Sequence, residues 1–270
     1  MPLSRLQTSL LQLLAKNRNP ESYVVGAVAI NRDGPRYSRD IDIFHDSDER
    51  LAATAEADAA TILSAGYKLT WTAHRATGKR SALVTGSGET AQLNWVADSD
   101  FRFFPVIPDE LFGFVLHPVD LATNKAAAAA DRRVPRDIVD LVTIDARILP
   151  LGAVVWAACG RFPGQTPEQM LAEIVRHGRF TAEEFHSLAV DKPLDIQKLA
   201  QSIRAMCAAA EAFIHAMPSE AAGCVFLRDG KVVQPDPGLL EKYEWHKDVR
   251  RGHWPTSIEI GQAMLQRHID

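Results

Sequence analysis

Residues 23–44 of the chain, YVVGAVAINRDGPRYSRDIDIF, decide its fold class. The apolar run Tyr23–Val25 predicts a short buried strand that ends at Gly26, followed by a short helix or turn. Asp33-Gly34-Pro35 then breaks the chain sharply. Arg39 to Phe44 alternates polar and apolar residues, which is typical of a half-buried strand. The stretch therefore predicts two strands of a sheet, separated by a short helical turn.

Asp40 and Asp42 are the residues of this stretch that carry chemistry. Side chains alternate between the two faces of a strand, so both carboxylates are expected on one face, with Ile41 and Ile43 on the other. Neighbouring carboxylates repel each other unless a cation lies between them. Mg²⁺ commonly joins one or two protein carboxylates to substrate phosphates. An Asp-x-Asp pattern alone is more often an exposed polar edge of a strand, so the neighbouring residues decide its meaning.

Gly26, Arg36 and Ser38, which precede the carboxylates in the sequence, favour a phosphate site. Gly26 ends a buried strand, where backbone amides can approach a phosphate closely. Arg36 and Ser38 add a cation and a hydroxyl just before Asp40. A glycine turn, a basic residue, a hydroxyl and two carboxylates thus fall within one short supersecondary unit.

The flanking sequence predicts a small mixed sheet with helices packed against it in the first half of the chain. Hydrophobic spacing and turn residues predict these elements: helices over 3–16, 48–65, 118–131 and 135–148, and strands over 67–72, 81–85 and 92–96. Gly78-Lys79 and Gly86 to Gly88 are expected turns between the strands. Pro150 ends the last of these helices, and we place a domain boundary there.

The second half of the chain reads as mainly helical. Helical composition covers 167–176, 182–188 and 196–217. Arg228-Asp229-Gly230 lies between two short apolar runs, and Asp-Gly is a strong hairpin signal. We therefore expect two domains, one over residues 1–150 and a mainly helical one with a single β-hairpin over residues 151–270.

Composition is that of an ordinary soluble globular protein, with 46% hydrophobic and 24% charged residues. No apolar run approaches the roughly 18 residues of a membrane-spanning helix, and we expect neither a secretory signal nor a membrane partner. Cys159, Cys207 and Cys224 are widely spaced and odd in number. They fit neither a disulfide framework nor a zinc site, so we expect reduced thiols and a cytoplasmic location.

The net charge of −4 argues against nucleic-acid binding by overall electrostatic attraction. Affinity for phosphates depends on local clusters, however. Two basic clusters are present, and for each a solvated surface is the more common explanation: Arg132, Arg133 and Arg136, and Lys247, Arg250 and Arg251.

Two motifs together resemble a known family. The first is Gly26 followed by Arg36-x-Ser38-x-Asp40-Ile-Asp42-Ile-Phe44. The second is the helical pair Val119–Lys125, then Asp131-Arg132, then Pro135–Leu141, which is similar to the pattern DLaxxK…R…RDxxDL. Both resemble the AbiEii-type nucleotidyltransferases, the toxin halves of abortive-infection toxin–antitoxin pairs in the DNA polymerase β-like superfamily. The resemblance covers residues 20–150.

The resemblance implies an α/β (α+β) fold with a polymerase β-like core and a mixed sheet, followed by a helical remainder. It implies that Asp40 and Asp42 bind magnesium, with Ser38 beside the triphosphate of a bound NTP. Lys125 would contact the nucleotide phosphates, and Asp137 would be a polar residue of the same site. Arg136 and Asp137 could equally form an ion pair that holds a helix in place.

The implied reaction transfers a nucleoside monophosphate from an NTP to an acceptor hydroxyl. Two Mg²⁺ ions would assist, one of them arriving with the NTP. The resemblance favours a tRNA 3′ end or another macromolecule as the acceptor, and an antitoxin protein as a further partner. A small-molecule nucleotidyltransferase of the antibiotic-modifying type is the first alternative.

Two departures from the family pattern keep a further alternative open. Ala27 stands where the family has glycine, serine or threonine, which removes a hydroxyl that could contact phosphate. The superfamily often has a third carboxylate on a later strand, and the expected strand 92–96 offers Asn94 there as the metal ligand. An amide can bind a metal ion but cannot act as a general base. A degenerate domain that binds nucleotide or a partner without turnover is therefore the second alternative.

Overall fold

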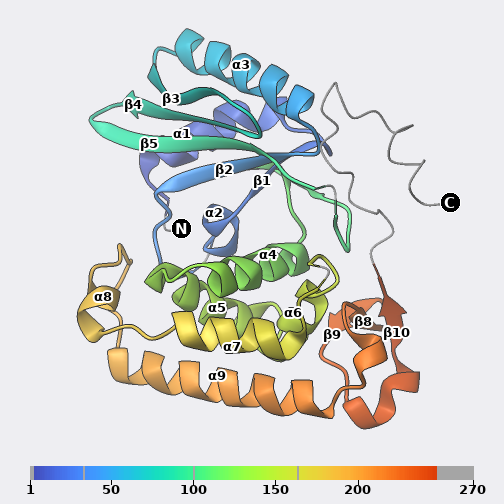
Figure 1. The fold of residues 1–270 in the computed structure, drawn as a ribbon. Helices are drawn as coiled ribbons and strands as arrows, with labels where there is room; N and C mark the ends of the chain where they lie inside the picture. Colours follow the sequence, from blue (N-terminus) through green and yellow to red (C-terminus); the bar gives the residue numbers. More distant parts are fainter. Residues whose placement is uncertain (1–2, 33, 100, 163, 248–270) are drawn as a thin grey trace, which may run out of the picture.

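A computed structural model describes residues 3–247 of the chain, except 33, 100 and 163. Arg250 and Arg251 of the second basic cluster lie outside the described residues. The molecule has a layered arrangement (Figure 1). Helices α1 (Arg5–Leu14) and α3 (Asp48–Ser64) cover one face of a central sheet, and a group of helices that begins with α4 (Pro118–Asp131) lies on the other side.

The sheet has seven strands in the order β3-β4-β5-β2-β1-β7-β6. Their bounds are β1 (Ser22–Val25), β2 (Asp40–His45), β3 (Lys68–Ala76), β4 (Lys79–Gly86), β5 (Glu89–Ala97), β6 (Ile107–Asp109) and β7 (Gly113–Val115). β2 pairs antiparallel with β1 and parallel with β5, so the sheet is mixed as predicted.

Most strand predictions are confirmed, and the differences have local causes. Lys79 was expected in a turn but begins β4, because the β3–β4 pairing extends to Ala76↔Lys79. β6 and β7 were not predicted. Each has three residues, and β6 contains Pro108, so neither shows the alternation that identifies a strand in sequence.

The apolar face of the sheet packs against α1 and α3. Ile41 and Ile43 are buried there together with Leu93 and Trp95 of β5. α1 begins with a capping box formed by Ser4 and Gln7, and its buried leucines, Leu6, Leu10, Leu11 and Leu14, lie on the face turned to the sheet. This packing turns the polar positions of β2 to the opposite face, as the alternation predicts.

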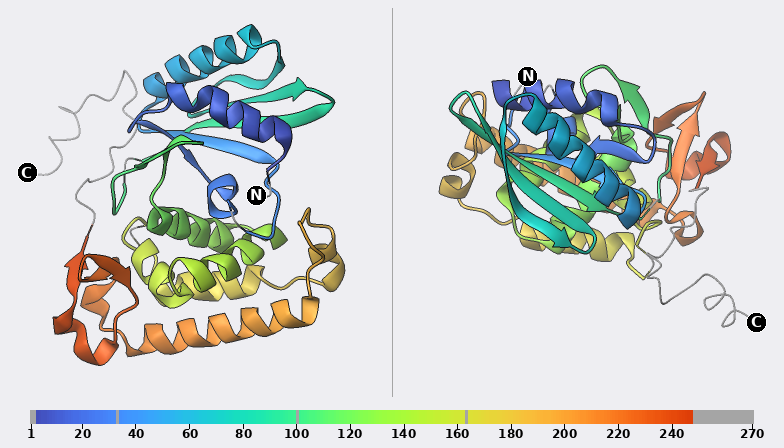
Figure 2. Two further views of the ribbon diagram at one scale, coloured as in Figure 1. Left: turned by 180° about the vertical axis from the view of Figure 1, so that it is seen from behind. Right: turned by 90° about the horizontal axis from the view of Figure 1, so that it is seen from above.

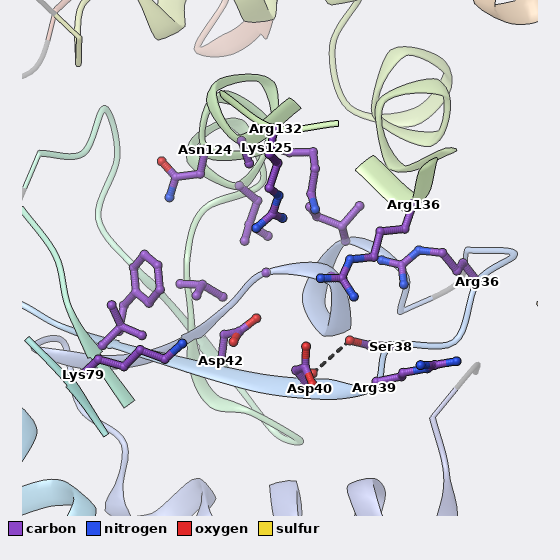
Figure 3. Close-up of a pocket in the computed structure, with 18 residues that line it drawn as sticks. Arg36, Ser38, Arg39, Asp40, Asp42, Lys79, Asn124, Lys125, Arg132 and Arg136 are labelled. Carbon is purple, nitrogen blue, oxygen red and sulfur yellow. Dashed lines mark hydrogen bonds between the residues drawn. The ribbon is translucent and has the colours of Figure 1, made fainter. Parts of the chain in front are cut away.

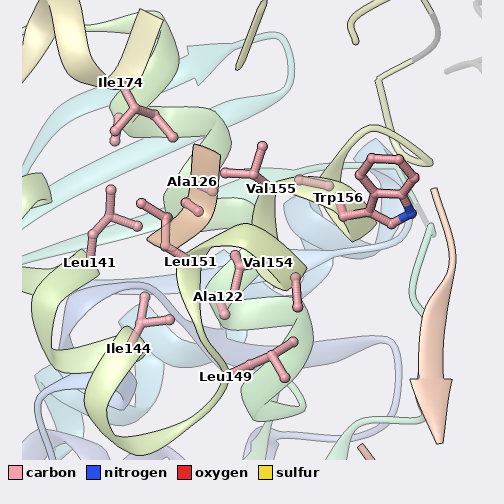
Figure 4. Close-up of a cluster of buried hydrophobic side chains, with 14 of the residues drawn as sticks. Ala122, Ala126, Leu141, Ile144, Leu149, Leu151, Val154, Val155, Trp156 and Ile174 are labelled. Atoms are coloured by element: carbon pink, nitrogen blue, oxygen red, sulfur yellow. The ribbon is translucent and has the colours of Figure 1, made fainter. Parts of the chain in front are cut away.

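The helices beyond the sheet share one apolar core. They are α4 with α5 (Pro135–Arg147), α6 (Leu151–Ala158), α7 (Pro167–His177), α8 (Ala182–His186) and α9 (Ile196–Ala216). α6 lies at the centre, and all eight of its residues are buried (Figure 4). It was not predicted as a helix, because a segment that is apolar on every side shows no helical periodicity.

A small second sheet lies beside the end of α9. The predicted hairpin is confirmed, with β8 (Val225–Arg228) and β9 (Lys231–Val233) joined at Asp229-Gly230, and β10 (Glu244–His246) adds a third strand. The remaining short elements are α2 (Ala27–Ile30), η1 (Ala15–Asn17), η2 (Ser219–Ala221) and η3 (Pro237–Lys242). Figure 2 shows this sheet at one end of the helical layer.

Two direct contacts join α6 to the segment that leads into the small sheet. Trp156 donates its indole N–H to the carbonyl of Ala221 at 2.7 Å, and its backbone carbonyl accepts the N–H of Gly223 at 3.0 Å.

Among the described helices, none is both long and apolar enough to cross a membrane. All three cysteines are free thiols.

A buried ion pair beneath the sheet offers a test of its packing. Asp58 of α3 is fully buried and accepts hydrogen bonds from Arg18, Asn17 and Trp95. Asp58→Ala leaves the Arg18 guanidinium buried without its counter-charge, so the free energy of unfolding should fall by about 3–5 kcal/mol. Glu173→Ala is the control, because it removes an exposed pair with Arg176 and should cost less than about 1 kcal/mol. Urea unfolding followed by circular dichroism measures both, and equal losses would contradict the prediction.

Candidate functional site

A cleft of about 340 Å³ lies between the polar face of β2 and helix α4 (Figure 3). The sheet side contributes the carboxylates Asp40 and Asp42 together with the cations Arg39 and Lys79, and the helix side contributes further cations. The polar and charged residues that line it are Arg36, Ser38, Arg39, Asp40, Asp42, Lys79, Asn124, Lys125, Arg132 and Arg136. The cleft therefore brings both sequence motifs to one place.

Asp40 and Asp42 project from β2 into the cleft, on the face opposite buried Ile41 and Ile43. The predicted alternation is confirmed. Burial raises the pKa of Asp42 above its usual value, and the charge of Asp40 adds to this effect. A hydrogen bond from Asn94 and the charge of Lys125 oppose the shift. Any group that brings positive charge into the cleft will therefore stabilise the ionised form of Asp42.

Gly26 makes room for the Asp42 carboxylate. Its φ of +75° lies in the left-handed region, and a Cβ at this position would be 2.6 Å from Asp42 Oδ2. A side chain here would thus meet both backbone strain and a collision. Position 26 therefore needs a glycine because the Asp42 carboxylate lies against it.

Lys125 is buried and faces the cleft, so it is not a solvated surface lysine. Its ammonium lies 2.8 Å from Asp137 Oδ1 and 3.0 Å from Asp140 Oδ2, both on α5. Asp137 was predicted as a polar residue of the site. The structure places it behind Lys125, fully buried, as the partner that holds the ammonium in position.

Two arginines complete this ion cluster, Arg36 from a buried position and Arg132 from an exposed one. Arg36 donates to both oxygens of Asp140, at 3.0 and 2.8 Å. Arg132 donates to Asp137 at 2.8 Å, so Asp137 pairs with Arg132 and Lys125. Burial alone would raise the pKa of Asp137 and of Asp140, but the adjacent cations lower both below their usual values. Three cations on two carboxylates leave one positive charge that faces Asp40 and Asp42.

Asn94 lies beside Asp42 on the neighbouring strand β5, in direct register with it. Its amide nitrogen donates to Asp42 Oδ1 at 2.9 Å. Its oxygen accepts hydrogen bonds from Ser81 and Gln92. Asn94 thus presents a donor to the carboxylate pair, while its oxygen is used within the sheet.

Ser38 lies just before β2 and lines the cleft. Its hydroxyl donates to the backbone carbonyl of Asp40 at 2.9 Å, which ties the turn to the start of the strand. The backbone carbonyl of Ser38 in turn accepts from the buried side chain of Gln7. The loop that carries Arg36 and Ser38 is therefore held from both sides.

Several cleft residues were not singled out from sequence. Lys79 reaches the cleft from β4 through its register with Val96, and Val96 is in register with Phe44 of β2. Nothing in the local sequence of Lys79 indicates this. For Asn124, the one indication in the sequence is its position directly before Lys125, a residue already expected at the site. Arg132 and Arg136 were recognised as a basic cluster, but their place at the cleft depends on the angle between α4 and α5.

No protein-family model matches the chain, and no curated protein matches it either. Solved structures do match. MenT4, a nucleotidyltransferase toxin from Mycobacterium tuberculosis H37Rv, superposes with a TM-score of 0.52 at 16% identity, over 76% of this chain and 82% of MenT4. A protein from H. pylori assigned as a nucleotidyltransferase gives 0.47 at 15% identity, over 78% of this chain and 94% of its own. The likeness to MenT4 shows that the chain has a nucleotidyltransferase fold.

The contact between Gly26 and Asp42 gives a testable expectation. Gly26→Ala should lower the free energy of unfolding by roughly 1–2 kcal/mol more than Gly88→Ala, because Gly88 also has positive φ but has open space around it. Chemical denaturation of both variants gives the difference. In an Asp42→Ala background this excess should shrink, and what remains measures the backbone strain at Gly26, whose φ of +75° and ψ of −157° essentially only glycine adopts. An excess that is unchanged there would show that the carboxylate is not what excludes a side chain.

Proposed function

We propose that this protein is a nucleotidyltransferase that moves a nucleoside monophosphate from an NTP to an acceptor hydroxyl. The observation that carries the proposal is the cleft itself, where Asp40 and Asp42 face a wall of cations anchored by Lys125. A triphosphate with a divalent cation satisfies both sides of such a cleft. The fold shared with MenT4, which is a nucleotidyltransferase, supports the same reaction class.

Magnesium fits the residues present. No group of three or more His, Cys, Asp or Glu side chains forms a closed metal site in the described part of the chain. Two carboxylates on one strand face leave most coordination positions to phosphate oxygens and water, which is how proteins commonly hold Mg²⁺. Asp40 and Asp42 would hold it, with Asn94 positioning Asp42. Magnesium bound there would stabilise charge on the attacking and leaving oxygens.

The side chains around the pair have separable roles. Lys125 is held in place by two carboxylates, so its ammonium can meet phosphate oxygens without a change of conformation. Arg39 and Arg136 form no ion pair with any described residue and are free to bind an anion. Asn94 cannot accept a proton as a base, so the acceptor hydroxyl must lose its proton to the carboxylate pair or to solvent.

The charge around the cleft favours an anionic acceptor. Arg39, Arg132 and Arg136 all lie along it. A cationic small molecule, such as an aminoglycoside, would be repelled there, whereas a nucleic-acid end would be attracted. We therefore propose a tRNA 3′ end or a similar RNA as the acceptor, with an antitoxin as a further partner. Incubation with each labelled NTP, with and without bulk tRNA, tests the reaction and the acceptor together.

The carboxylate pair gives the most direct test of the reaction. Asp40→Asn and Asp42→Asn should each lower NTP-dependent labelling of the acceptor by roughly 10³-fold or more, because each removes a magnesium ligand. The fold should be retained, since Asp40 and Asp42 are only partly buried. Asp131→Asn, at the exposed end of α4, is the control and should keep full activity. Full labelling by either cleft variant would refute the proposed site.

Asn94→Asp tests the metal site by a readout other than activity. The new carboxylate would replace a donor that lies 2.9 Å from Asp42 Oδ1, so metal-free protein should melt at a lower temperature than wild type. Added Mg²⁺ should raise the melting temperature of this variant more than that of wild type, because the site gains an anionic ligand. Turnover should rise with metal affinity.

Asn19→Asp adds the same charge on an exposed loop and should show no altered response to magnesium. If Asn94→Asp lost stability and activity without any gain in magnesium response, Asn94 would serve the sheet alone.

A further inference from the structure

The two ends of the cleft differ in chemistry. Side chains at alternate positions of β2 face it in the order Asp40, Asp42 and Phe44. Phe44 is in register with Val96, so the floor of the cleft beyond Asp42 is apolar, with Lys79 at its edge. Arg36, Arg39 and Arg136 lie at the Asp40 end (Figure 3). Phosphates therefore suit the Asp40 end, and a flat apolar group such as a nucleobase suits the Phe44 end.

Asn124 of α4 lines this cleft, and its amide has one orientation. Arg161 donates from Nη1 to Asn124 Oδ1 at 2.6 Å. The amide nitrogen has no hydrogen-bond partner among the described residues. Figure 3 shows this nitrogen on the side of the cleft where Lys79 and Asp42 lie. The free group is thus a donor, because the acceptor of the amide is already occupied.

Arg161 is itself held in place by the second half of the chain. It follows the buried helix α6 and pairs through its other terminal nitrogen with Asp98, at the end of β5. The preceding residue, Gly160, packs directly on Gly223, where a Cβ would lie 2.6 Å from a backbone oxygen. Arg161 is thus fixed by its bond to Asp98 and by the packing of the backbone before it. It therefore holds the Asn124 amide in one orientation.

We infer that Asn124 reads the base of the nucleotide, and that its fixed donor selects a keto base over an amino base. Guanine O6 and uracil O4 accept a hydrogen bond, whereas adenine N6 and cytosine N4 donate. If the Asn124 N–H faces the amino group of adenine or cytosine, both donors remain without a hydrogen bond in a desolvated site, which weakens binding. Arg161 is a positioning residue for this choice. The inference rests on the proposed function, because it assumes that the cleft binds an NTP.

Calorimetric titration with GTP, UTP, ATP and CTP in magnesium buffer tests the inference without turnover. Wild type should bind GTP and UTP about tenfold more tightly than ATP and CTP. Asn124→Asp keeps the oxygen that faces Arg161 and turns the free donor into an acceptor, so the ranking should invert. The added negative charge weakens the binding of all four NTPs alike. The quantity to compare is therefore the ratio of the affinities for keto bases to those for amino bases.

Arg161→Met removes the hydrogen bond that fixes the amide, so the ratio between keto and amino bases should fall toward one. Arg133→Met is the matched control, since Arg133 also binds a carboxylate and a carbonyl but bonds to no residue that lines the cleft, and it should keep the wild-type ratio. A wild-type preference for ATP or CTP, or a ranking unchanged in both the Asn124 and the Arg161 variants, would overturn the inference and leave the proposed function standing. Failure to bind any NTP would overturn both.

Discussion

The buried contact of Lys125 with Asp137 and Asp140 is the interaction on which the candidate site depends. It fixes α4 against α5, and Arg36 extends it to the loop that leads into β2. A buried ion cluster is weak evidence for stability, because desolvation of the charges offsets most of their attraction. The cluster instead fixes the positions of α4, α5 and the loop before β2, because each charged side chain must lie where it reaches its partners. The cluster holds one excess positive charge beside Asp40 and Asp42.

The carboxylate pair is the counterpart of that cluster. Burial raises the pKa of Asp42, and repulsion from Asp40 on the same strand face adds to that shift. Gly26 gives Asp42 its space, and the amide of Asn94 supplies a hydrogen bond. Opposite charges are thus held apart across a cleft and do not collapse into one ion pair. A cleft of this kind is complementary to a ligand that carries both signs, as a magnesium-bound triphosphate does.

The helical half of the chain contributes to the cleft as well as to the core. α4 and α5 precede the predicted boundary at residue 150, yet they share an apolar core with α6, α7 and α9 beyond it. Arg161 lies in the second half and touches a residue that lines the cleft. The orientation of one wall of the cleft is therefore set by packing between segments that the sequence separates into two halves.

The sequence alone determined the elements whose signal is local. Strand alternation placed Asp40 and Asp42 on one face, and the two motifs indicated the nucleotidyltransferase fold before the sheet order was known. Tertiary structure decided what depends on neighbours distant in sequence. The helix α6 has no periodicity because it is buried on all sides, and Lys79 reaches the cleft only through strand register. The orientation of Asn94 and Asn124 likewise follows from their hydrogen-bond partners, because an amide is both donor and acceptor and only its surroundings decide which group it presents.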